Sequence, residues 1–119
     1  MSRVFVVQNQ HRWDRDGRQF VPKYDISSAH QFGNIVELLS PTAAPFNSEP
    51  ILEELRAKLA DFKDEDYILC IGNPLLLAWA FAIAADANHG AAKALQWSGK
   101  DHRYIPVEVV DLFGPPDDQ

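Results

Sequence analysis

The feature that most constrains the fold is an apolar segment at residues 67–90, YILCIGNPLLLAWAFAIAADANHG. Residues 67–71 lack charge, as expected for a strand buried on both faces of a parallel sheet. Gly-Asn-Pro at 72–74 interrupts the segment, which leaves too few consecutive apolar residues to cross a bilayer. Residues 75–87 are apolar nearly all round a helix, which indicates burial on more than one side, by other elements or by a second subunit.

The rest of the chain alternates between strand-like and helix-like patterns. β-Branched and aromatic runs predict strands, whereas capping residues followed by apolar residues at helical spacing predict helices. The order β-α-β-α-β-α-β-β predicts an α/β fold: a Rossmann-like, three-layer domain with helices on the faces of a mixed, mainly parallel sheet that ends in a β-hairpin. The expected strands are 3–7, 34–40, 67–71, 92–97 and 103–110, and the expected helices are about 28–32, 48–62 and 75–87.

A further turn is expected inside the first long connection. Asp16-Gly17 is a turn signal, and we expect Trp13 and Phe20 to flank an irregular hairpin around it. The following residues, up to the helix expected at 28–32, show no periodic pattern.

Length and charge limit the classes of function. The 119 residues fit a single domain over 1–113, followed by a flexible tail at 114–119. A net charge of -6 argues against direct nucleic-acid binding and against a membrane surface as partner. The only cysteine, Cys70, allows no internal disulfide, and the opening MSRVFVV is too short for a signal peptide. Both observations favour a cytoplasmic location.

Two loops are candidates for a ligand site. In open α/β sheets, ligands bind beyond the carboxyl ends of the strands, and the loops 40–48 and 72–74 both lie there and lead into helix N-termini, which favour anions. Neither loop contains Lys or Arg, and no nucleotide-binding motif is present, so the alternative that these residues only form turns stays open. The candidate ligand-binding residues are Ser40, Thr42, Asn47, Ser48, Gly72 and Asn73.

The sequence contains no recognisable catalytic set. The four histidines are far apart and have no Cys, His or carboxylate at metal-ligand spacing. Neither Ser40 nor Cys70 has an identifiable base. We therefore predict no metal, no cofactor and no catalytic residues, and a binding function is favoured over an enzyme.

A contact surface is predicted near the C-terminal hairpin. Trp97 ends a strand, and it could form an interface patch with Arg103 and Tyr104, because aromatic residues and Arg are enriched at interface centres. The alternative, that Trp97 simply packs over the hairpin, stays open. The apolar helix at 75–87 suggests that the chain also forms a homodimer.

Several stretches together resemble a known family. LLSPTAAPFN, DYILCIGNP, AIAADANHG and LQWSGKDHRYIPVEV are similar to a family of small uncharacterised proteins encoded by bacteriophages and prophages. The resemblance implies an accessory protein in the cytoplasm of the host cell, which binds a host or phage macromolecule and could inhibit host defence. The alternative function is binding of a small molecule or nucleotide at the 40–48 and 72–74 loops.

Overall fold

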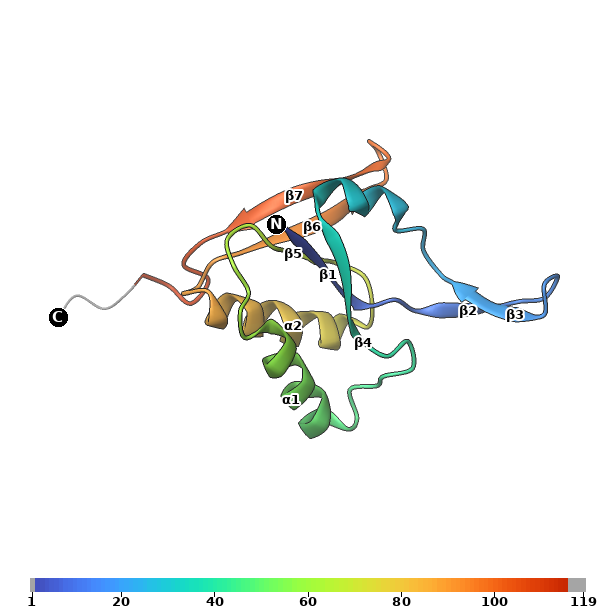
Figure 1. The fold of residues 1–119 in the computed structure, drawn as a ribbon, viewed down its shortest axis with the longest axis horizontal. Helices are drawn as coiled ribbons and strands as arrows, with labels where there is room; N and C mark the ends of the chain where they lie inside the picture. Colours follow the sequence, from blue (N-terminus) through green and yellow to red (C-terminus); the bar gives the residue numbers. More distant parts are fainter. Residues whose placement is uncertain (1, 116–119) are drawn as a thin grey trace.

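The computed structural model describes residues 2–115 and consists of a five-stranded sheet, a separate two-stranded hairpin, two α-helices and a 3-10 helix (Figure 1). The sheet has the order β4-β1-β5-β6-β7; the first four strands are parallel and β7 is antiparallel to β6. The sheet strands are β1 (Arg3–Gln8), β4 (Asn34–Leu39), β5 (Tyr67–Leu69), β6 (Ala92–Ser98) and β7 (Arg103–Val109), and the hairpin strands are β2 (His11–Asp14) and β3 (Gln19–Pro22).

Both α-helices pack on one face of the sheet. Along β1, side chains alternate between the two faces, and Phe5 and Val7 point to the helical side. There they join a core with apolar residues of α1 (Ser48–Leu59) and α2 (Pro74–Ala87), including Leu55 and Leu76.

The opposite face of the sheet has a thinner cover. Val4 and Val6 of β1 point to this side, where they pack with Leu69 and with Ala29 of the 3-10 helix η1 (Ser27–Phe32). β1 is therefore buried on both faces, and it lies inside the sheet between β4 and β5. Among residues 2–115, no helix is long and apolar enough to cross a membrane.

This arrangement differs from the expected Rossmann-like, three-layer domain. The connection from β1 to β4 steps to one side of β1, whereas those from β4 to β5 and from β5 to β6 step to the other. Right-handed crossovers then place η1 on one face and both α-helices on the other. Much of the first connection forms the hairpin, and only the 3-10 helix η1 covers the sheet there. The structure therefore confirms an α/β fold with a mixed, mainly parallel sheet, but not α-helices on both faces.

The remaining elements largely follow the sequence patterns. The third strand ends at Leu69, two residues earlier than expected, because the Ile71 amide already donates to the Leu69 carbonyl in a tight turn. The first α-helix ends at Leu59, although Phe62 beyond it still packs in the core. In the tail expected at 114–119, residues 116–119 lie outside the part of the chain that the structure describes.

Candidate functional site

The two loops predicted to form a ligand site are joined by a buried side chain, Gln8 at the end of β1. Its Nε2 donates a hydrogen bond of 2.7 Å to the Ala43 carbonyl, and its Oε1 accepts one of 3.0 Å from the Asn73 amide. Gln8 therefore links the two loops. The Gln8 amide group lies between them and uses backbone groups that a ligand would otherwise contact.

The predicted loop residues mostly bond to their own loops. The Ser40 and Thr42 hydroxyl oxygens are 3.0 Å apart. Asn73 caps α2, because its Oδ1 accepts hydrogen bonds from the amides of Leu75 and Leu76 at 2.9 and 3.3 Å. The amides at the start of this helix are thus already occupied by its own cap.

The other three predicted residues have separate roles. Asn47 precedes α1 without a side-chain capping bond, and Ser48 is the exposed first residue of that helix. Gly72 has a φ of 122°, and a Cβ there would lie 2.9 Å from the Cβ of Gln8. Glycine is therefore required at this position by backbone conformation and by the close approach of β1.

A cavity of about 680 Å³ begins at Gly72 of the 72–74 loop, on the η1 side of the sheet, and no residue of the 40–48 loop lines it. It is found where β5 and β6 end, and it is lined by Cys70, Ile71 and Gly72 after β5 and by Trp97 near the end of β6. The segment that joins the β2–β3 hairpin to η1 supplies another wall, with Lys23, Tyr24 and Asp25. The remaining wall is formed by His102, in the turn between β6 and β7, and by Tyr104 of β7.

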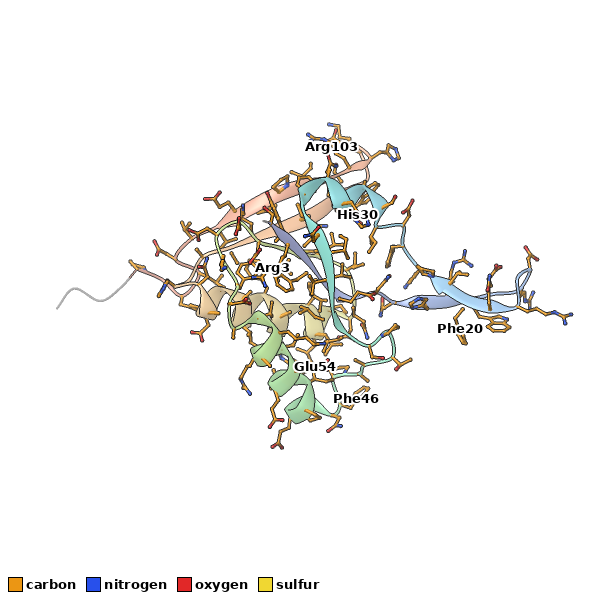
Figure 2. All side chains as sticks on the ribbon, in the orientation of Figure 1. Arg3, Phe20, His30, Phe46, Glu54 and Arg103 are labelled. Atoms are coloured by element: carbon orange, nitrogen blue, oxygen red, sulfur yellow. The ribbon has the colours of Figure 1, made fainter. Side chains whose placement is uncertain are left out.

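The predicted contact patch is divided between two surfaces. Trp97 and Tyr104 are paired across β6 and β7, and their rings form an edge-to-face contact with centroids 5.0 Å apart. Both rings line the cavity, with Trp97 43% exposed and Tyr104 buried. Arg103, which is labelled in Figure 2, is an exposed neighbour of Tyr104 on β7. It does not belong to the residues that line the cavity. Side chains alternate along β7, so Arg103 lies on the other face of the β6–β7 hairpin.

The charge states of the cavity follow from its contacts. Hydrogen bonds from the Ser27 amide and hydroxyl lower the pKa of Asp25, so this side chain is a carboxylate at neutral pH. Burial raises the pKa of the Cys70 thiol, and burial together with the charge of Asp25 raises the pKa of Tyr104. The cavity therefore offers a carboxylate, a neutral phenol and an unactivated thiol. Within residues 2–115, no three His, Cys, Asp or Glu side chains are grouped to hold a metal ion.

The β2–β3 hairpin is the second feature with functional character. We call residues 11–23 the arm; it extends away from the sheet in Figure 1, and the Lys23 amide closes its base by donating to the Gln10 carbonyl at 2.7 Å. Trp13 and Phe20 face each other across the two strands with ring centroids 5.1 Å apart, and they are 53% and 69% exposed. The arm contains four Lys or Arg residues and two Asp, although the whole chain is acidic.

Sequence reasoning missed several of these residues. The role of Gln8 could have been predicted, because it ends the first strand of a parallel sheet, and functional side chains gather at the carboxyl ends of such strands. Lys23, Tyr24 and Asp25 had no such signal, because they lie in a connection without periodicity. The hairpin itself was predicted, but its projection from the body was not.

Together these features define the chain as a small α/β protein with an open cavity at the carboxyl edge of its sheet and a projecting β-hairpin. A family model described as phage Pam3 gp32-like protein matches residues 2–111, and the chain belongs to this family. The match confirms the resemblance to small phage-encoded proteins. No curated protein and no solved structure matches the chain.

Proposed function

We propose that this phage protein is an accessory protein that acts in the host cytoplasm by binding a host or phage protein through its arm. The observation that carries the proposal is the exposed pair Trp13 and Phe20 on a projecting hairpin. A two-stranded hairpin buries little apolar surface of its own, so two large aromatic residues on it gain most when a partner covers them. A host-defence protein is one partner of this kind.

The charges favour a protein over a nucleic acid as the partner. Outside the arm the chain contains fifteen Asp or Glu residues and only seven Lys or Arg. A body with this excess of negative charge repels a phosphate backbone. Within the arm, Arg15 and Arg18 lie in the turn beyond the aromatic pair. Trp and Arg are the residue types that most often dominate binding energy in protein interfaces. The expected partner surface has an apolar pocket for the rings and acidic groups at its rim.

Site-specific cross-linking in phage-infected host cells tests the proposal. A photoreactive amino acid replaces Phe20 in one variant and Phe46 in the other. Phe46 is 97% exposed but lies on the loop before α1, away from the arm (Figure 2), so it serves as a matched control. We expect a specific protein adduct from position 20 and none from position 46.

The partner identified by cross-linking is then purified on its own and titrated with the phage protein that carries no photoreactive amino acid. We expect Trp13→Ala/Phe20→Ala to weaken binding at least ~10-fold, whereas Phe46→Ala changes it less than about twofold. Equal affinity of the arm variant, or binding that disappears after nuclease treatment, would overturn the proposal.

A further inference from the structure

We propose that the cavity at the ends of β5 and β6 is a binding site for a nucleoside monophosphate. This site lies at the base of the arm, from which it takes only Lys23, and it does not depend on the function proposed above. It also differs from the ligand site expected from the sequence, because of the six predicted loop residues only Gly72 lines it. Four observations support the proposal: the position of the cavity, its size, its aromatic walls and its charged groups.

The cavity lies where the sheet topology favours ligands. The chain leaves β1 toward β4 on one side and later continues from β5 toward β6 on the other, so β1 and β5 flank a topological switch point. In open α/β sheets, ligands bind outside the carboxyl ends of the strands at such a point. The cavity begins directly after β5, at Cys70 and Gly72. Its volume of about 680 Å³ is within the range of small-molecule sites.

The walls suit a flat heteroaromatic ring. Tyr24 and Trp97 are 45% and 43% exposed, and both line the cavity together with Tyr104. The edge-to-face contact with Tyr104 holds the Trp97 ring, so little side-chain freedom is lost when a ligand stacks on it. Stacking of a base on an aromatic side chain contributes about 1–3 kcal/mol. The neutral Cys70 thiol adds an apolar surface.

The polar groups suit a ribose and one phosphate. The Asp25 carboxylate can accept hydrogen bonds from sugar hydroxyls, and the Lys23 ammonium and the His102 ring can contact a phosphate. The Lys23 Nζ lies 5.4 Å from the centroid of the Tyr24 ring, which opposes a cationic ligand among these aromatic residues. With one Lys and one His on an acidic protein, a monophosphate fits the local charge better than a triphosphate.

Titration of the intact protein with AMP, GMP, CMP and UMP tests the proposal, by calorimetry and by tryptophan fluorescence. Adenosine and inorganic phosphate, titrated separately, report the contributions of the two halves of the ligand. We expect saturable binding of at least one monophosphate with a Kd below ~1 mM, and quenching of the tryptophan fluorescence, to which Trp97 contributes together with Trp13 and Trp79. Adenosine should bind more weakly than AMP, and phosphate alone more weakly still.

Variants locate the bound ligand. We expect Trp97→Ala to weaken binding at least ~10-fold and Trp97→Phe, which keeps a ring, to weaken it less than about threefold. Lys23→Ala should reduce the preference for AMP over adenosine, because His102 is left as the other group facing the phosphate. Trp13→Ala, on the arm, is the control and should bind as the wild type does.

Circular dichroism of each variant confirms that it is folded. If Trp97→Ala is unfolded, Trp97→Phe and Lys23→Ala still test the site. No saturable binding of the four monophosphates, binding unaffected by Trp97→Ala, or phosphate binding as tight as AMP binding would overturn the proposal. None of these results would change the interaction proposed for the arm, and loss of the arm interaction would not affect the titration.

Discussion

Replacement of Gln8 by alanine tests how the two loops at the carboxyl edge of the sheet are held. The side chain is buried, and its amide group bonds to the Ala43 carbonyl and to the Asn73 amide. A hydrogen bond contributes about 0.5–1.5 kcal/mol net, and the Ala43 carbonyl and the Asn73 amide are only partly buried, so water can replace part of what they lose. Loss of both bonds should therefore lower the free energy of unfolding by about 1–3 kcal/mol, out of the ~5–15 kcal/mol typical of a small domain.

Urea unfolding measures this change, and amide hydrogen exchange shows where it acts. In Gln8→Ala, the Asn73 amide should exchange faster relative to global unfolding, because its acceptor is gone. Gln31→Ala is the control. The side-chain amide of Gln31 donates to the Ser28 carbonyl in an exposed position, so the free energy of unfolding of this variant should differ from that of the wild type by less than ~0.5 kcal/mol. A loss below ~1 kcal/mol in Gln8→Ala, with unchanged exchange at Asn73, would refute the role given to Gln8.

Three further predictions follow from the contacts. Asp66 is buried and accepts hydrogen bonds from the Arg3 amide and guanidinium, at 3.0 Å and 2.7 Å, and from the Lys63 amide. Arg3 is partly exposed and keeps its ion pair with Asp61, so Asp66→Ala should destabilise the protein by about 2–4 kcal/mol in urea unfolding, mainly because two backbone amides lose their acceptor; a loss below ~1 kcal/mol would contradict this. Folding raises the pKa of Cys70 and Tyr104, so their stabilising contribution is complete below the unfolded pKa values and is lost as the pH rises through the folded ones. Urea unfolding should therefore show falling stability in the alkaline range, and Cys70→Ser should reduce the fall; an identical pH profile in this variant would contradict the thiol contribution. The exposed apolar side of α2, including Leu75, leads us to propose a homodimer. Light scattering at micromolar concentration should then give twice the 13.4 kDa chain mass for the wild type and the mass of a single chain for Leu75→Glu. A monomer mass for the wild type would exclude the dimer.

The elements could be predicted from the sequence because their signals are local. The uncharged run at 67–71 indicated an inner strand, and Asn73-Pro74 marked the start of the helix that follows. Asp16-Gly17 indicated the hairpin turn. Each of these signals depends on a few neighbouring residues, so it is present in the sequence itself.

The layer arrangement could not be predicted in the same way. Periodicity shows that a segment has an apolar side, but it does not say which face of a sheet that side covers. Residues 27–32 have helical capping signals, yet they form a 3-10 helix, and the chain between β1 and η1 is used for the arm. Helix placement therefore depends on strand order, which arises from contacts between distant residues.

The candidate site was predicted only in part, for a similar reason. Gly72 and Trp97 were assigned to different sites, whereas the structure places both in one cavity. Because these two residues are far apart in the sequence, no local pattern indicated that they line the same cavity. Tyr24 and Asp25 enter the same cavity from a connection whose sequence has no periodic signal. Gln8, which joins the two predicted loops, acts through backbone partners whose identity the sequence does not reveal.

The most direct test of the proposed function is the affinity of the cross-linked partner for the wild type and for Trp13→Ala/Phe20→Ala. These residues form the exposed aromatic pair of the arm, and their removal leaves the core of the body unchanged. We predict at least ~10-fold weaker binding by the arm variant and unchanged binding by Phe46→Ala. Equal affinities of the wild type and the arm variant would contradict the account.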